Sequence, residues 1–242
     1  GRVLLLTVMQ PGPDDADAAE PEQPPRSLVA AQQVQREALA AALAAGSSPQ
    51  SLLTIASSPW EEIERLAEDL QCESLLVGLS ELDALQARDA ALEQLLNEVR
   101  CDVAILRTRP AWRLRRVRRV LVPTGGKSGQ VVPRARLLGS LARVAGPRVT
   151  FLQVLPAGAG DDEREDALHA LLQLAADETP GAPEALVVRS DDVARAVAER
   201  AADSDLVVLG LQRIRGRTLF GDVALRIAAE TDCAMVMISR GS

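Results

Sequence analysis

Aromatic side chains are scarce in this sequence. Of its 242 residues, two are Trp, two are Phe and none is Tyr. Proteins that hold single-stranded nucleic acids stack bases on aromatic rings, so this composition disfavours that class. No apolar run approaches the roughly 20 residues of a membrane helix, and Val3–Val8 is too short for a signal peptide. Because a strand pattern follows Gly1 at once, we expect an internal fragment or a processed product.

Residues that carry chemistry are equally few. The single histidine, His169, has no partner pattern for a catalytic triad or a metal site and is expected on a helix surface. Lys127, the single lysine, lies in GGKS, but a phosphate-binding P-loop would need glycine at Leu121. We therefore expect no catalytic residue, no metal site and no enzyme activity.

Three cysteines occur, an odd number without CxxC spacing, and they predict buried, reduced thiols in a cytosolic setting. They are Cys72, Cys101 and Cys233.

The formal charge of −7 is unevenly distributed. Residues 1–106 carry 6 Arg and 18 acidic residues, whereas residues 107–119 carry 7 Arg and no acid. The remainder is close to neutral. An acidic body disfavours a nucleic-acid partner, and the arginine segment is a local exception.

Apolar runs of strand length alternate with amphipathic helical stretches, which predicts βαβ units and a parallel sheet of the α/β class. The expected strands are Val3–Val8, Leu52–Ile55, Leu75–Leu79, Val103–Leu106, Val120–Val122, Val149–Leu155, Ala185–Val188, Leu206–Leu209 and Ala234–Ile238. The expected helices are Leu28–Ala45, Trp60–Leu70, Leu85–Val99, Val131–Val144, Asp166–Ala176, Val193–Ala202 and Val223–Ala229. Gly46 is expected to end the first helix, Pro59 to begin the second, and Asp191 or Asp192 to cap the sixth.

The sequence repeats internally. Residues 1–12 align with 147–158, and from the next strand onward the two halves align at an offset of 132 positions. At that offset Gly78 matches Gly210 and Cys101 matches Cys233. The alignment predicts a first repeat over 1–108, an Arg-rich linker over 109–117 and a second repeat over 118–242.

The first repeat differs from the second in two places. Residues 11–26, with five Pro and five acidic residues, form an acidic insertion that reads as a solvated loop or a partner-binding loop. The strand and helix of residues 119–144 have no counterpart before Gly1. Either this unit lies upstream, or the first repeat closes as a four-stranded sheet of order 3-2-4-5.

The second repeat resembles the universal stress protein family. The resemblance rests on VLVPT (120–124), RVTFLQVLP (148–156) and the stretch 205–239; it covers 118–240, and more weakly 1–108. It implies two flavodoxin-like, doubly wound parallel sheets in tandem, the first lacking its leading strand and helix. Members of the family often pair through the last strand, which here means Val103–Leu106 and Ala234–Ile238.

Nucleotide-binding members of the family carry a loop of the form G-x2-G-x9-G-(S/T) after the fourth strand and an Asp after the first. Gly210 matches the first glycine, but Arg213 replaces the second and Gly221 comes two residues early, followed by Asp222. ATP is therefore not an expected cofactor. The degenerate candidate residues are Thr124, Gly125, Gly126, Gly210, Arg213, Gly216 and Gly221.

Tandem domains of this kind resemble the cytoplasmic tails of membrane transporters, including prokaryotic relatives of cation-chloride cotransporters in the amino-acid permease superfamily. The resemblance implies a non-catalytic regulatory or assembly domain on the cytoplasmic side of an inner membrane. Its partners would be the membrane domain of its own transporter and a second copy, with the repeats packed together. The alternative is a stand-alone tandem stress protein that binds ATP.

The linker arginines leave three interpretations open: contact with anionic lipid head groups, docking on the acidic first repeat, or a solvated linker. These residues are Arg113, Arg115, Arg116, Arg118 and Arg119.

Overall fold

The computed structural model describes residues 2–10, 26–79, 90–109, 112–125, 131–214, 217–219 and 221–241. The acidic insertion up to residue 25, Asp89, Gly126, Lys127 and Gly216 lie outside these ranges. The chain divides into two compact units, Gly1–Leu70 and Gln71–Ser242. This division falls earlier than the repeat boundary predicted near residue 108, so the second unit includes the end of the first repeat.

The first unit is built on a two-stranded parallel sheet. Strands β1 (Leu4–Met9) and β2 (Gln50–Ile55) pair in register from Leu4 opposite Gln50 to Met9 opposite Ile55. Helix α1 (Arg26–Ala44) contacts both strands, and α2 (Pro59–Asp69) contacts β1. Pro59 begins α2 and Gly46 follows α1 with a φ of 77°, both as expected from the sequence.

A seven-stranded sheet forms the second unit, in the order β3-β4-β11-β8-β5-β6-β7. Its strands are β3 (Ser74–Leu79), β4 (Asp102–Arg107), β5 (Arg119–Thr124), β6 (Arg148–Leu155), β7 (Glu184–Arg189), β8 (Leu206–Gly210) and β11 (Ala234–Ser239). Every pairing is parallel except that of β4 with β11. The strands of the second repeat therefore follow the doubly wound order that the sequence predicted.

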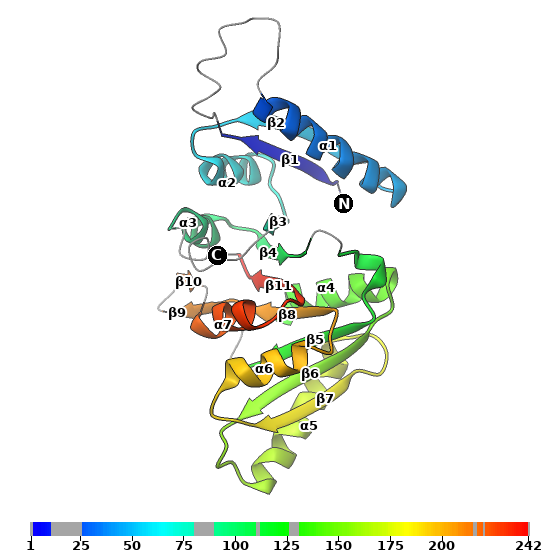
Figure 1. The fold of residues 1–242 in the computed structure, drawn as a ribbon, viewed down its shortest axis with the longest axis vertical. Helices are drawn as coiled ribbons and strands as arrows, with labels where there is room; N and C mark the ends of the chain where they lie inside the picture. The colour runs from blue at the N-terminus through cyan, green and yellow to red at the C-terminus, as the bar shows by residue number, and fades with distance from the viewer. Residues whose placement is uncertain are drawn as a thin grey trace, which may run out of the picture. The chain divides into compact units, whose positions relative to one another are not determined.

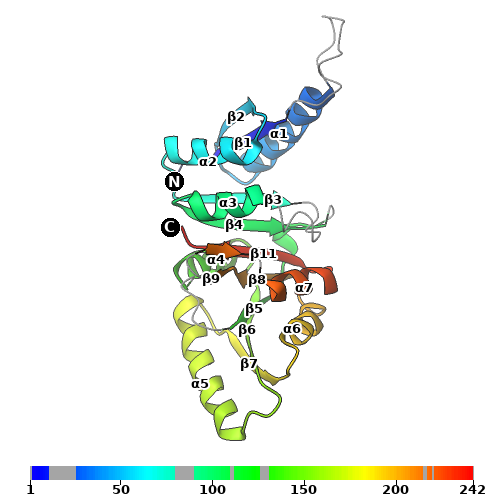
Figure 2. The same cartoon turned by 90° about the vertical axis from the view of Figure 1, so that its left-hand side faces the viewer.

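Helices cover both faces of this sheet (Figures 1 and 2). Helices α4 (Val131–Val144) and α5 (Asp161–Glu178) lie on one face, and α6 (Val193–Ala201) and α7 (Asp222–Glu230) on the other. Helix α3 (Ala90–Glu98) connects β3 to β4. Strand residues such as Phe151 and Val208, both 0% exposed, pack with Leu138 and Leu171 of the helices to form the core. Among the described residues, each helix is too short or too polar to span the hydrocarbon core of a bilayer.

One ion pair is buried in this unit. The Arg134 guanidinium of α4 makes two hydrogen bonds of 2.5 Å to the Glu178 carboxylate at the end of α5. The two side chains are 3% and 0% exposed. The two-pronged geometry satisfies both charges and fixes the approach of the two helices.

The antiparallel pair β4–β11 joins the two repeats. Ile105 lies opposite Met237. Met237 is also the residue of the second repeat that corresponds to Ile105 at the offset of 132. Leu106 lies opposite Val236 and Ala104 opposite Ile238, so the pairing is symmetric about this point. A pseudo-two-fold axis therefore passes between Ile105 and Met237, and the predicted pairing of the last strands is confirmed.

The strands of the first repeat belong to two compact units. Strand β1 pairs with β2 in the first unit, and β3 pairs with β4 in the second. The sheet of order 3-2-4-5 stays a prediction. In the second repeat β5 lies between β6 and β8 and pairs with both, and the first repeat has no strand in that role within the described ranges.

Sequence periodicity located most elements, but it missed an antiparallel hairpin, β9 (Gln212–Ile214) with β10 (Arg217–Leu219). It also placed the start of α5 five residues late, at Asp166 instead of Asp161. The three acidic residues that begin α5 favour the positive end of the helix, although they break its apolar pattern. His169 is exposed on α5 as predicted.

Candidate functional site

The topological switch point of the doubly wound sheet lies between β5 and β8. From β5 the chain passes to β6 on one side, and β8 pairs with β5 on the other. Ligands of such folds bind at the carboxyl ends of the strands at this point. Thr124 ends β5 and Gly210 ends β8, so the structure brings these two predicted candidates to the same edge.

The β5 side of this edge has no free hydroxyl aimed outward among the described residues. Thr124 is half-buried, and its Oγ1 donates a hydrogen bond of 3.1 Å to the Leu152 carbonyl oxygen. Gly125 is exposed, and a Cβ placed there would meet no atom within 4 Å. Packing therefore does not require glycine at this position.

The β8 side is closed by backbone pairing. After Gly210, the Leu211 amide donates to the Ile238 carbonyl oxygen at 2.8 Å. The chain then enters the hairpin, where Arg213 of β9 lies opposite Thr218 of β10. A phosphate-binding loop needs amides that point at the ligand from small residues. A paired hairpin uses its backbone for the ladder instead.

An acidic side chain stands at the start of α7. Gly221 is the N-cap residue, with φ −62° and ψ 150°, and Asp222 is exposed in the first turn. The carboxylate is well placed to interact with the helix dipole, and it would repel a phosphate at the same place. Together with the hairpin, Asp222 makes the described residues a poor fit for the phosphates of ATP.

Two acid–arginine ion pairs, which the sequence analysis did not anticipate, lie at the end of β7 and at the start of α6. Arg189 donates to Asp161 at 2.6 Å, and Arg226 donates to Asp192 at 2.8 Å. These hydrogen bonds lower the pKa of both carboxyl groups. Asp192 also accepts from the Arg195 amide, which confirms the expected N-cap of α6.

At the opposite edge, the linker is held against the second repeat. Trp112 Nε1 donates to the Asp205 carbonyl oxygen at 3.3 Å, and the Asp205 carboxylate accepts from the Arg118 and Arg119 amides at 2.7 and 2.9 Å. Trp112 and the buried Val117 pack on the core. Between them lies a short 3-10 helix, η2 (Leu114–Arg116), and all five predicted linker arginines are exposed.

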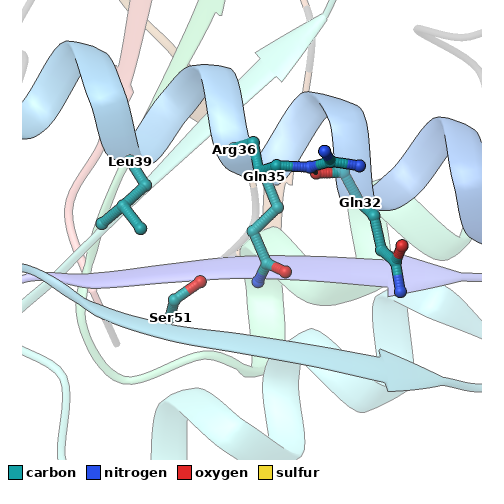
Figure 3. A pocket seen from close by; sticks show the side chains of 5 residues that line it. All are labelled: Gln32, Gln35, Arg36, Leu39 and Ser51. Carbon is teal, nitrogen blue, oxygen red and sulfur yellow. Dashed lines mark hydrogen bonds between the residues drawn. The ribbon is translucent and has the colours of Figure 1, made fainter.

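The first unit has a shallow hollow of about 250 Å³ between α1 and β2. Figure 3 shows Gln35 reaching from α1 toward the strands, where Ser51 stands on β2. Gln32, Arg36 and Leu39 complete the lining. The lining offers amides and one guanidinium but no nucleophile paired with a base.

The described residues thus define a doubly wound α/β protein whose repeats pair through their last strands and whose chain forms a hairpin after β8. Residues 1–107 match the model of the universal stress protein family. The match falls in the repeat whose residues carry the resemblance more weakly. The chain has the fold of universal stress proteins.

Two solved structures extend this likeness over the whole chain. A universal stress protein from Archaeoglobus fulgidus aligns over 100% of this chain and 86% of its own, with a TM-score of 0.55 and 15% identity. The cytoplasmic domain of a prokaryotic cation chloride cotransporter aligns over 99% of this chain and 85% of its own, with a TM-score of 0.55 and 13% identity. Curated proteins include no significant match.

Proposed function

We propose that this chain is a non-catalytic regulatory or assembly domain of a membrane transporter for ions or amino acids. The observation that carries the proposal is the paired hairpin β9–β10, followed by Asp222, where nucleotide-binding relatives keep an open glycine loop. A domain that has lost the nucleotide site in this way keeps the fold, and the surface of that fold remains available for assembly with other proteins. The likeness to a cotransporter cytoplasmic domain supports this role.

In this proposal the partners are the membrane domain of the same transporter and a second copy of the chain, on the cytoplasmic face of an inner membrane. The antiparallel pair β4–β11 is already used within the chain. Dimerisation would therefore involve another surface.

Transport measurements test the proposal directly. The full-length protein is reconstituted in proteoliposomes with and without residues 1–242, and ion or amino-acid flux is compared at equal protein density. We expect the deletion to change the rate of flux or the oligomeric state. Unchanged flux together with an unchanged oligomer would overturn the proposal, as would a gene that encodes no membrane helices.

The second candidate is a stand-alone tandem stress protein that binds ATP. The family match over 1–107 and the open space at Gly125 favour it. Calorimetric titration with ATP discriminates the two, and we expect no binding at micromolar concentrations. The double variant Gly125→Asp/Asp222→Ser restores the family's acidic and hydroxyl positions and serves as the comparison. A micromolar dissociation constant for the unaltered chain would favour this second function.

A further inference from the structure

Six arginines form an exposed cationic surface at the amino edge of the seven-stranded sheet, and we name it the arginine patch. Its members are Arg115, Arg116, Arg118, Arg119, Arg143 and Arg148. Arg118 Nη1 donates to the Ala145 carbonyl oxygen just beyond α4, and the Arg148 amide donates to the Arg118 carbonyl oxygen. The patch therefore spans η2, the end of α4 and the starts of β5 and β6, which lie together in Figure 1.

The guanidinium groups of the patch are not neutralised. Within the described ranges, no carboxylate lies within ion-pair distance of any of the six. Four acidic residues near the starts of the strands lie along the same edge of the sheet. Of these, Asp205 binds the backbone amides of Arg118 and Arg119, Glu184 accepts from Thr150, Asp232 pairs with Arg109, and Asp203 is exposed. The local balance is strongly positive on a chain whose formal charge is −7.

The backbone beneath the patch is fixed. Trp112 and Val117 flank η2 and pack on the core, and Asp205 holds the two amides that follow. A pre-ordered display of charge loses less conformational entropy on binding than a flexible basic segment does. This anchoring distinguishes the patch from a solvated linker.

Exposed aliphatic side chains lie among the arginines. Leu114 of η2 is 37% exposed, and Val144 at the end of α4 is 53% exposed. Arginine stems and aliphatic side chains together fit the boundary between lipid head groups and acyl chains. A nucleic-acid surface would instead need exposed rings for stacking or a recognised binding module. The aromatic side chain that borders the patch, Trp112, is half-buried and bonded to Asp205.

We propose that the arginine patch docks on the surface of an anionic phospholipid bilayer, with Leu114 and Val144 against the head-group boundary. The inference goes beyond the proposed function, because its partner is lipid and not the membrane domain of a transporter. Each arginine near such a surface strengthens binding by about fivefold, and salt weakens the attraction.

Vesicle sedimentation with the full chain tests this proposal. Vesicles of phosphatidylcholine with about one-third phosphatidylglycerol are compared with pure phosphatidylcholine, at low and high salt. We expect binding only to the anionic vesicles, and a roughly 25-fold loss in Arg115→Gln/Arg116→Gln. Arg164→Gln/Arg195→Gln removes the same charge from exposed sites near the starts of α5 and α6, and it is expected to bind within about twofold of the unaltered chain.

Three results would overturn the proposal. They are no binding to anionic vesicles at low salt, an equal loss in the patch and control variants, or tighter binding to single-stranded RNA that the patch variant abolishes. Because these vesicles contain no transporter, the result is independent of the flux measurement. The variant Leu114→Ser measures the apolar contribution of Leu114 to vesicle binding. It is expected to reduce binding even at high salt, because salt does not screen apolar contacts.

Discussion

Two threonines in equivalent places make opposite contributions at the scale of single residues. Thr179 follows α5 and Thr231 follows α7, and each is 7% exposed. The Thr231 hydroxyl oxygen accepts a hydrogen bond of 3.1 Å from the Cys233 amide. The Thr179 hydroxyl is buried and has no hydrogen-bond partner among the described residues.

Valine substitution at these two threonines is therefore expected to act in opposite directions. Thr231→Val leaves the Cys233 amide without its acceptor and should lower the free energy of unfolding by about 1–2 kcal/mol. Thr179→Val removes an unpaired buried hydroxyl at nearly constant volume and should leave stability unchanged or raise it by up to about 1 kcal/mol. Urea denaturation of both variants measures the difference. Equal losses would show that Thr179 has a partner.

Cys233 makes stability depend on pH in the alkaline range. Its thiol donates to the Ser204 carbonyl oxygen at 3.1 Å, and burial, helped by the nearby Asp205, raises its pKa to about 11 from an ordinary value of 9.0. Burial also raises the pKa of Cys101. Above pH 9 the unfolded chain loses these protons while the folded chain keeps them, so the free energy of unfolding must fall.

This fall is open to direct measurement, because the chain has no Tyr and Lys127 is its only lysine. We expect a loss between pH 9 and 11, with a Cys233 share of the order of 1 kcal/mol after allowance for its partial exposure. Cys233→Ala should reduce the loss without abolishing it, since Cys101 remains, and Cys72→Ala is the matched control. An unchanged pH profile in Cys233→Ala would contradict the assignment.

At the scale of elements, the linker depends on one carboxylate. Asp205 Oδ2 accepts from both Arg118 and Arg119, and no other side chain in the described structure bonds these two amides. Asp205→Ala is expected to lower the free energy of unfolding by about 2–3 kcal/mol, because two amides lose a charged acceptor. It should also speed trypsin cleavage within residues 113–119.

Asp205→Asn provides the control for this prediction. It retains an oxygen for the two amides but loses the charge, so its effect on both measurements should be intermediate. Faster cleavage elsewhere in the chain, with residues 113–119 still protected, would contradict the role of Asp205.

The sequence predicts the long strands of the sheet but not the short hairpin after β8. Strands of continuous apolar residues, such as Leu206–Leu209 in the second repeat, are visible in the sequence because both faces of the sheet are covered. Arg213 and Asp222 indicate a closed glycine loop, but they do not predict the hairpin. Its strands have three residues each, too few for a periodic pattern. In the sequence, Arg215 and Gly216 separate the two strands. A separation of two residues is typical of a β-hairpin, and it is the one feature of the sequence that could have predicted the hairpin.

For the whole molecule, the structure predicts that the second repeat needs strands from the first. All six residues of β11 are buried, and β4 covers the edge of β11 that faces away from β8. A fragment of residues 71–242 retains this pairing and is expected not to associate through β11. A fragment of residues 109–242 exposes the β11 edge and is expected to dimerise or aggregate through it.

Analytical ultracentrifugation of the two fragments measures this difference. Met237→Lys in the shorter fragment places a charge at the centre of the exposed edge and should favour the monomer. A shorter fragment that stays monomeric without this change would show that β4 is dispensable.

Long-range pairing is the part least accessible from the sequence. The repeat offset makes Met237 the counterpart of Ile105, and the family's pairing of last strands predicts the β4–β11 contact correctly. The sequence does not decide whether β1 joins β3, because the local pattern of each strand is the same in either arrangement. Strand pairing depends on which strand edges come together, and contacts between residues distant in the sequence determine this.

The axis between Ile105 and Met237 has a consequence for how the two repeats can diverge. In a dimer of identical subunits, any substitution near the axis enters the contact twice. In this chain a substitution changes the β4–β11 contact at one place only, so the two ends of the contact can carry different residues. At one end, Arg107 Nη1 donates to the Thr231 and Cys233 carbonyl oxygens. The residue that corresponds to Arg107 in the second repeat is Ser239. At the other end, the Gly241 amide donates to the Asp102 carboxylate. Because both repeats belong to one chain, a substitution can change one end of the β4–β11 contact and leave the other end as it is.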